Sequence, residues 1–283
     1  MRAVAAEDAA AAHAAFQTMP KTKKIVYQVA ADAEALSLRT AELFADCIAQ
    51  SIAARKLARI AISGGSTPRR TFAMLADPNL PFRERIDWSR LFLFWVDERC
   101  VPPDHADSNY RMTREELLSK VPLPEAQILR MEGELDPHEA AARYESTLRN
   151  QFRLEGAEVP CFDLIALGMG DDGHTASLFP GTEALHELMR LVAANFVPQK
   201  DMWRITLTAP VLNHARNVVF QIAGKNKDLV LRNVLLGPYD PERTPSQLIC
   251  PDAGSLLFLL DTDAAAQLPA PDKNGIGMLE VKR

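Results

Sequence analysis

A short apolar run that passes directly into a glycine-rich acidic turn constrains the fold of this chain more than any other stretch. Residues 163–167 form the run, and residues 168–174 form a turn with three glycines, two aspartates and one histidine. An apolar run of this length, bounded by turn residues, is typical of a strand buried on both faces. Because glycines leave backbone N–H groups uncovered, the turn is expected to present polar groups at the strand's end.

The same arrangement recurs along the chain. Apolar residues 59–62 lead into the Ser/Gly-rich segment 63–68, residues 91–96 lead into the charged triplet 97–99, and residues 217–223 lead into a turn that contains two lysines. Helical patterns alternate with these runs, at residues 33–54, 69–76, 110–120, 137–154, 182–189, 210–215 and 228–236. Alternating strands and helices predict an α/β protein, a three-layer Rossmann-like fold whose mainly parallel central sheet is covered by helices on both faces.

Further strands are predicted at residues 24–29, 127–131 and 255–260. Residues 204–208 alternate between polar and apolar side chains, which is typical of a half-exposed strand. No internal repeat or low-complexity linker divides the 283 residues, so we expect one α/β domain over residues 21–268. The alanine-rich residues 1–20 are predicted to be a disordered or frayed extension, and residues 269–283 a C-terminal tail.

The composition narrows the possible partners. A formal net charge of -5 argues against nucleic acid, which is bound through clustered Lys and Arg. No stretch approaches the roughly 18 continuous apolar residues needed to span a membrane. The four cysteines lack the C-x-x-C spacing, which favours free thiols in a reducing compartment and therefore a cytoplasmic location.

The segment Ser63, Gly64, Gly65, Ser66 and Thr67 predicts a phosphate site. Thr67 is expected to cap the helix that follows, with Pro68 at the first helical position. The glycines leave backbone N–H groups free at a helix N-terminus, where phosphate is attracted. A capped helix after a flexible turn is the simpler reading, but it does not account for the Ser-Gly-Gly-Ser sequence.

The charged triplet 97–99 would alone be read as a solvated loop. However, it follows an apolar strand, as do segments 63–67 and 168–174 and the turn that contains Lys225 and Lys227. Parallel strands bring their carboxyl ends to one edge of the sheet, which is where ligands bind in such folds. The sequence therefore predicts one site that combines an anion cradle, cations, carboxylates and an imidazole.

These blocks together resemble the 6-phosphogluconolactonase family, and the resemblance extends over about residues 25–265. The segments that carry it are residues 63–68, 97–99, 108–112, 168–180 and 204–208. The related glucosamine-6-phosphate deaminases share the Ser-Gly-Gly loop and the Asp-Gly-His turn. They typically lack the arginine of the Asp-Glu-Arg triplet and the Thr-Ala-Ser-Leu-Phe-Pro continuation that residues 175–180 show here.

The resemblance implies hydrolysis of a sugar-phosphate lactone, 6-phospho-D-glucono-1,5-lactone, in the oxidative pentose phosphate pathway. It implies His174 as the general base that activates water, assisted by Asp172. The Ser-Gly-Gly loop, Arg99 and Lys200 would hold the phosphate, with Arg204 and Lys227 as further candidates. Such chemistry needs neither a metal nor another cofactor, so none is expected.

Three other functions are compatible with parts of the sequence. Residues 168–173 match the G-x-G-x-x-G pattern of nicotinamide dehydrogenases, but Asp171 and Asp172 would face the pyrophosphate, and the turn lies late in the chain. An amino-sugar-phosphate deaminase or isomerase would use the same scaffold. A non-catalytic sugar-phosphate sensor would not need Asp172 and His174 together.

Overall fold

An eight-stranded sheet forms the centre of the protein in the computed structural model, which describes residues 22–251 and 253–282. The strands of the protein are β1 (Thr22–Ala30), β2 (Ala58–Ile62), β3 (Leu91–Trp95), β4 (Asp97–Arg99), β5 (Ile128–Leu129), β6 (Leu164–Leu167), β7 (Val192–Val197), β8 (Met202–Leu207), β9 (Asn217–Ile222), β10 (Ser255–Asp261) and β11 (Ile276–Lys282). The central sheet has the order β11-β1-β10-β9-β6-β2-β3-β5. All neighbours in it are parallel except β1 and β11.

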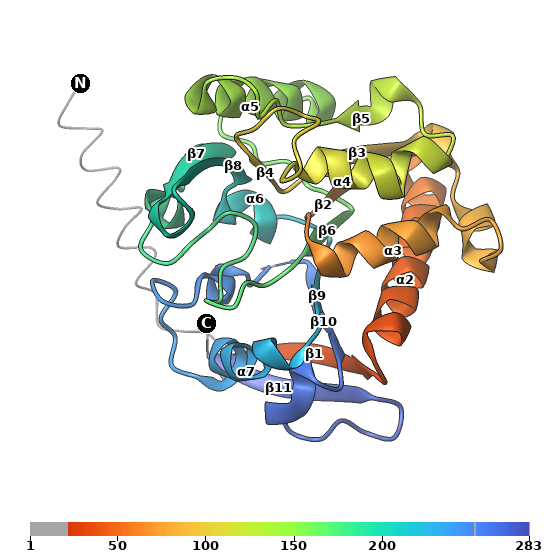
Figure 1. The fold of residues 1–283 in the computed structure, drawn as a ribbon, viewed down its shortest axis with the longest axis vertical. Helices are drawn as coiled ribbons and strands as arrows, with labels where there is room; N and C mark the ends of the chain where they lie inside the picture. Colours follow the sequence, from red (N-terminus) through yellow and green to blue (C-terminus); the bar gives the residue numbers. More distant parts are fainter. Residues whose placement is uncertain (1–21, 252, 283) are drawn as a thin grey trace.

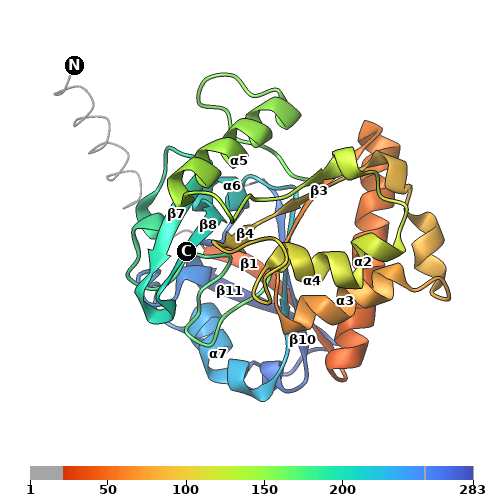
Figure 2. The ribbon, with the colours of Figure 1, turned by 45° about the horizontal axis from the view of Figure 1, so that its top comes forward.

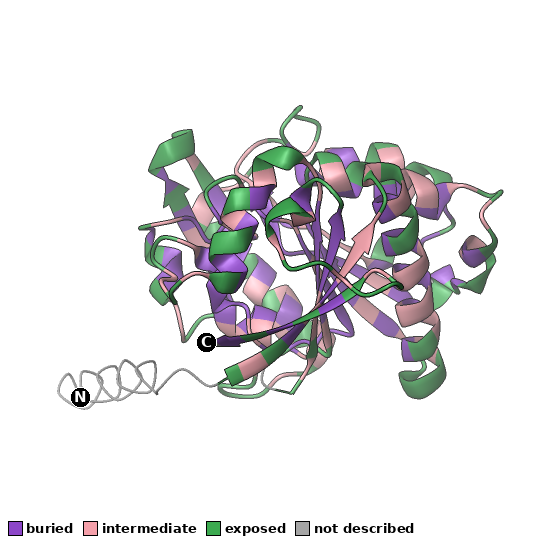
Figure 3. Cartoon of the chain, turned by 90° about the horizontal axis from the view of Figure 1, so that it is seen from below, coloured by how far each residue is buried: buried purple, intermediate pink, exposed green. Residues whose placement is uncertain are grey.

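Helices cover both faces of this sheet. They are α2 (Ala33–Arg55), α3 (Ser66–Ala76), α4 (Asn109–Glu116), α5 (Pro137–Phe152), α6 (Ala209–Asn213) and α7 (Asp228–Leu236). One apolar cluster joins the sheet to α2 and α3, and a second joins its other face to α5, α6 and α7. Figures 1 and 3 show these layers on the two sides of the buried strands. The predicted three-layer α/β fold is confirmed.

The N-terminal part of the fold shows why sequence periodicity predicts it well. The long alanine- and leucine-rich helix α2 begins after Asp32, whose carboxylate accepts a hydrogen bond from the N–H of Ala35 at 2.8 Å. Such N-caps satisfy a donor that would otherwise lack a partner at the helix start. The helix buries Phe44 and Ile48 against the sheet, so the apolar spacing along the helix matches the face that packs.

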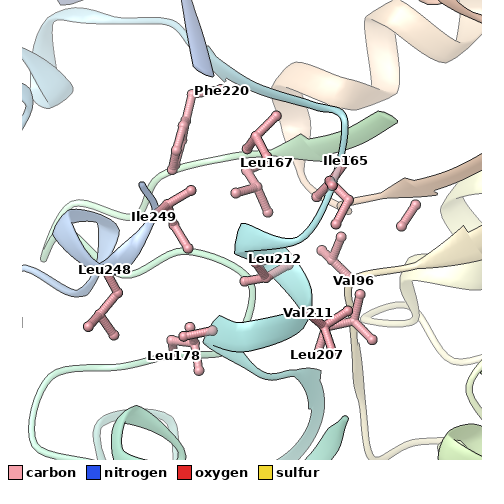
Figure 4. Packing of buried hydrophobic residues seen from close by; sticks show 14 of the residues in the cluster. Val96, Ile165, Leu167, Leu178, Leu207, Val211, Leu212, Phe220, Leu248 and Ile249 are labelled. Atoms are coloured by element: carbon pink, nitrogen blue, oxygen red, sulfur yellow. The ribbon is translucent and has the colours of Figure 1, made fainter. Parts of the chain in front are cut away.

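A second sheet, of three antiparallel strands in the order β4-β8-β7, stands beside the central sheet. The chain enters it directly from β3 through Val96, whose carbonyl accepts a hydrogen bond from the N–H of Leu207 at 2.7 Å. Figure 4 shows Val211 and Leu212 of α6 in the apolar layer that contains Leu207 and the β6 residue Ile165. This packing joins the two sheets and holds β4 and β8 near the carboxyl end of β6.

The structure corrects several local predictions. The C-terminal segment 269–283 is not a tail, since it includes β11, which pairs with β1 along seven residues. Residues 182–189 contain only a short 3-10 turn, η5 (Glu183–His186), and the triplet 97–99 is the strand β4. Strand β8 is buried from Arg204 to Leu207, because it is the middle strand of its sheet. The predicted extension, residues 1–20, lies outside the described residues.

Candidate active site

A pocket of about 300 Å³ lies at the carboxyl ends of β2, β6 and β9, beside the small sheet. Nearly all residues predicted for the site line it: Ser63, Gly64, Gly65, Ser66, Thr67, Arg99, His174, Lys200, Arg204 and Lys227. Asp172 does not line the pocket and lies behind His174. The parallel topology therefore gathers residues that are more than a hundred positions apart, as expected for the switch region of a parallel sheet.

The segment between β2 and α3 forms one wall. Ser63 is buried and donates a hydrogen bond from Oγ to the carbonyl of Ala166 on β6 at 2.8 Å. Gly65 has φ +117, a conformation that favours glycine, and it is the residue immediately before α3. The helix begins at Ser66 without a side-chain cap, so the prediction that Thr67 caps it and Pro68 opens it is wrong. The reason is that Gly65 already turns the chain two residues earlier.

Gly64 allows this wall to pack against α4. A Cβ atom at Gly64 would come within 1.8 Å of Oδ1 of Asn109, the first residue of α4. Asn109 in turn donates from Nδ2 to the carbonyl of Asp97 on β4 at 2.9 Å. The helices α3 and α4 lie side by side in Figures 1 and 2. The glycine is thus needed for a close approach and not only for a flexible loop.

Glu98 fixes the start of α4. Its carboxylate accepts hydrogen bonds from the backbone N–H groups of Arg99, Asn109 and Tyr110 and from Oγ of Ser108. Glu98 is 3% exposed, and burial raises the pKa of its carboxyl group while these hydrogen bonds oppose the rise. The negative group placed at a helix N-terminus explains why a charged triplet forms a buried strand.

The turn after β6 aims the imidazole of His174. Nδ1 of His174 lies 2.5 Å from Oδ1 of Asp172, and the same oxygen accepts a hydrogen bond from the His174 N–H at 3.1 Å. Partial burial raises the pKa of the Asp172 carboxyl, but the hydrogen bonds and charge of His174 outweigh it, and the net shift is downward. A carboxylate on Nδ1 selects the tautomer in which Nε2 is free to accept a proton.

Glycines close this turn. Gly173 has φ +81, and its N–H donates to the carbonyl of Gly170 at 3.1 Å. The N–H of Gly170 donates to the carbonyl of His174 at 2.8 Å. The predicted polar turn at the end of a buried strand is therefore present, and it brings the side chains of Asp172 and His174 together.

Two arginines face the pocket from the small sheet. Arg99 on β4 and Arg204 on β8 are paired across the strands, and Arg204 is only 8% exposed. Their Nε atoms are buried and have no hydrogen-bond partner within residues 22–251 and 253–282. Burial first, and then the charge of Arg99, lower the pKa of Arg204. Arg99 is half-buried, and its Nη1 donates to the carbonyl of Asp107 at 2.6 Å. Two guanidinium groups beside one pocket, one of them buried, form a site suited to an anion.

The two predicted lysines differ in their surroundings. Lys200 ends the 3-10 turn η6 (Pro198–Lys200) between β7 and β8 and is exposed. Lys227 ends η7 (Lys225–Lys227) before α7, and its ammonium group forms an ion pair with Asp171. Asn226 also donates to Asp171, at 2.9 Å. Lys227 therefore reaches the pocket while it is held against the turn that carries His174.

A family model described as "Glucosamine-6-phosphate isomerases/6-phosphogluconolactonase" matches residues 31–258. The chain belongs to this family. A 6-phosphogluconolactonase of Synechocystis sp. is 43% identical to it over 223 residues, which cover 78% of this chain and 89% of the relative. A 6-phosphogluconolactonase of Nostoc sp. is 41% identical over 249 residues, which cover 87% of this chain and 99% of the relative.

The fold agrees with that of a solved family member. The structure of 6-phosphogluconolactonase from Trypanosoma brucei superimposes with a TM-score of 0.74 at 30% identity, covering 88% of this chain and 100% of the other. The family resemblance that the sequence segments indicated is thus confirmed.

The pocket of this chain is also lined by residues to which the sequence assigned no individual role: Asp97, Asn109, Ser177, Phe179 and Gln221. The buried carboxylate of Asp97 accepts a hydrogen bond from Oγ of Ser177 at 2.7 Å, which ties β4 to the segment after His174. Asp97 belongs to the charged triplet that follows an apolar strand, and this position is the signal for it in the sequence. Gln221 carries no such signal, because it lies within the buried run of β9 and bonds to Thr71 on α3.

Two further observations concern possible partners. None of the helices in the described part of the chain is long and apolar enough to cross a membrane. Within that same part, His, Cys, Asp and Glu side chains do not form a group of three or more that could hold a metal ion.

Proposed function

We propose that this protein hydrolyses 6-phospho-D-glucono-1,5-lactone to 6-phospho-D-gluconate, the second step of the oxidative pentose phosphate pathway. The observation that carries the proposal is the position of His174. Its imidazole is held by Asp172 and faces a pocket that also contains a helix N-terminus and two arginines with unused donors. The names of the relatives from Synechocystis and Nostoc support this substrate.

His174 acts as the general base. Its Nε2 atom takes a proton from water, and the resulting hydroxide attacks the lactone carbonyl carbon to form a tetrahedral oxyanion. When this intermediate collapses, the bond between the carbonyl carbon and the ring oxygen breaks. The ring oxygen then takes the proton from Nε2, which restores the neutral imidazole and leaves a free hydroxyl and a carboxylic acid. Asp172 keeps the proton on Nδ1 throughout and stabilises the imidazolium that forms.

The phosphate is held at the wall of the pocket formed by Ser63, Gly64, Gly65, Ser66 and Thr67. The start of α3 offers backbone N–H groups and the positive end of the helix dipole. Arg99 and Lys200 supply charge, and Arg204 and Lys227 complete the cationic lining. A grip on the distant phosphate places the lactone carbonyl near Nε2, which is the main contribution that binding makes to such a reaction.

A second candidate is an amino-sugar-phosphate deaminase or isomerase, because the family model covers both activities. Glucosamine 6-phosphate would be its substrate, and release of ammonia would identify it. Incubation of the protein with glucosamine 6-phosphate separates the two activities, since the lactonase is expected to release no ammonia.

The test of the proposed function follows the disappearance of freshly prepared 6-phosphogluconolactone with and without the protein. The spontaneous opening of the lactone is subtracted. We expect an enzyme-dependent rate that saturates with substrate, and a rate equal to the uncatalysed reaction would reject the proposal. A cytoplasmic location is proposed with this function, because Cys47, Cys100 and Cys161 are free thiols in the described part of the chain, as expected in a reducing compartment.

A further inference from the structure

Phe179 stacks on the imidazole of His174. The two ring centroids lie 3.8 Å apart, and the ring planes differ by 19°. On another side the imidazole lies against the backbone of Gly170, where a Cβ atom would come within 2.0 Å of Nδ1 and 2.1 Å of Cε1. Together with the hydrogen bond to Asp172, these contacts enclose the ring on three sides.

The backbone of Phe179 is tied to the small sheet through Thr182. Phe179 is 2% exposed, and its carbonyl accepts hydrogen bonds from the N–H of Thr182 at 3.2 Å and from its Oγ1 at 2.8 Å. Thr182 Oγ1 accepts in turn from Nδ2 of Asn195 on β7 at 3.0 Å. The stack therefore joins the imidazole, which follows β6 of the central sheet, to a residue whose backbone is tied to the other sheet.

The hydrogen bond to Asp172 cannot orient the imidazole alone. It restrains Nδ1 only within the distance and angle that a hydrogen bond tolerates. Because the χ2 angle of histidine has a broad energy profile, the ring plane can still rock within that range. A flat aromatic neighbour at stacking distance fixes the plane, and with it the direction of Nε2. A base must lie within hydrogen-bond reach of the proton that it takes, so this direction matters for the rate.

We propose that Phe179 is a positioning residue, which fixes the plane of the His174 ring so that Nε2 points at the attacking water. The proposal rests on the proposed role of His174 as base. If Phe179 only filled the core, its loss would lower stability in the same way as the loss of any other buried phenylalanine. A positioning role instead lowers kcat and leaves KM unchanged.

The kinetic test compares Phe179→Leu with Phe162→Leu, the same change at a buried core ring that contacts Phe94 and Phe152 and does not line the pocket. Misplacement of a catalytic group by about 1 Å can cost 10²-fold in rate. We therefore expect Phe179→Leu to lose roughly 10 to 10²-fold in kcat with unchanged KM, and Phe162→Leu to keep its kcat. Phe179→Tyr, which keeps the ring, should restore most of the rate. Equal kcat losses in the two leucine variants, or none in Phe179→Leu, would overturn the proposal.

A spectroscopic readout tests the stack without relying on activity. In the full chain, the ring current of Phe179 should shift the carbon-bound protons of the His174 imidazole upfield, and this shift should disappear in Phe179→Leu. The signals are assigned by their loss in His174→Asn. Phe179→Met gives the same comparison if the leucine variant does not fold.

The two readouts separate the two claims. If the wild-type chain shows no lactonase activity, the proposed function fails, whatever the spectrum shows. Wild-type imidazole signals without an upfield shift would overturn the positioning role even in an active enzyme. A shift that is present in the wild type, lost with the ring and accompanied by the kcat loss supports it.

Discussion

Arg99 and Arg204 are direct partners across the antiparallel strands β4 and β8, and both side chains line the same pocket. Like charges placed opposite each other on paired strands destabilise a sheet. The Nε atoms of both residues are buried and lack partners within the described chain, which adds a desolvation cost. An arrangement that lowers the stability of the empty protein is expected at a site that binds an anion.

The first prediction concerns this pair. Arg204→Met keeps most of the side-chain volume but removes one charge and one unsatisfied donor. The empty protein should become more stable by about 1 kcal/mol, the lower end of the cost of a buried unsatisfied donor. Urea unfolding with and without inorganic phosphate measures both effects: phosphate should stabilise the wild type more than the variant. A less stable variant that phosphate protects equally well would contradict the role of Arg204.

The second prediction concerns Asp172. Asp172→Asn preserves the shape of the side chain but no longer selects the tautomer with a free Nε2. The value of kcat should fall by roughly 10² to 10⁴, the contribution of general base catalysis, while KM changes little. Steady-state kinetics on the lactone measure both constants. Asp171→Asn is the matched control, since Asp171 pairs with Lys227 and not with His174, and wild-type kcat in Asp172→Asn would argue against the pair.

The third prediction is a pH dependence of stability. The pKa of the Asp172 carboxyl is lower in the folded protein than in the unfolded chain. The carboxylate therefore stabilises the fold at pH values above its unfolded pKa. This contribution is lost as the pH falls through the folded pKa. The difference in unfolding free energy between the wild type and Asp172→Asn should therefore be largest near neutral pH and shrink in acid. Denaturant unfolding over this pH range measures it. A difference that grows on acidification would have the wrong sign.

The fourth prediction concerns the contact between Gly64 and Asn109. Gly64→Ala would place a Cβ atom 1.8 Å from Asn109 Oδ1, so either α4 or the pocket wall formed by residues 63–67 must move. We expect a lower melting temperature, in line with the roughly 1 to 3 kcal/mol that overpacking costs, and a higher KM. Gly168→Ala is the control for stability, because a Cβ atom there meets nothing within 4 Å. Equal melting temperatures for both variants would show that the wall adapts without strain.

Much of the fold follows from local patterns. Helix α2 consists largely of residues with high helix propensity, and strands β3 and β9 are nearly continuous apolar runs. The alternation of such helices and strands predicts one mainly parallel sheet. The edge strand β11 could not be predicted in this way, since its seven residues include one glycine and two charged residues, which are accommodated at the edge of the sheet. Its pairing with β1 depends on contacts that are about 250 residues apart in sequence.

The candidate site was predictable where polar residues directly follow an apolar strand, as in the segments that contain Ser63 and His174. Phe179 and Gln221 were not, because an aromatic or amide residue in a buried segment has no sequence signal that separates packing from function. Taken alone, the charged triplet indicates a solvated loop, because Glu98 becomes a buried helix cap only once α4 lies against β4. Tertiary contacts here override the usual preference of charged residues for solvent.

The central claim is that His174 is the base of a lactonase, and one comparison tests it most directly. Initial rates of 6-phosphogluconolactone hydrolysis are measured for the wild type, for His174→Asn and for His214→Asn, whose histidine is exposed and lies outside the pocket. We expect His174→Asn to lose roughly 10² to 10⁴ in kcat with little change in KM, and His214→Asn to remain as active as the wild type. Turnover by His174→Asn close to that of the wild type would contradict the claim.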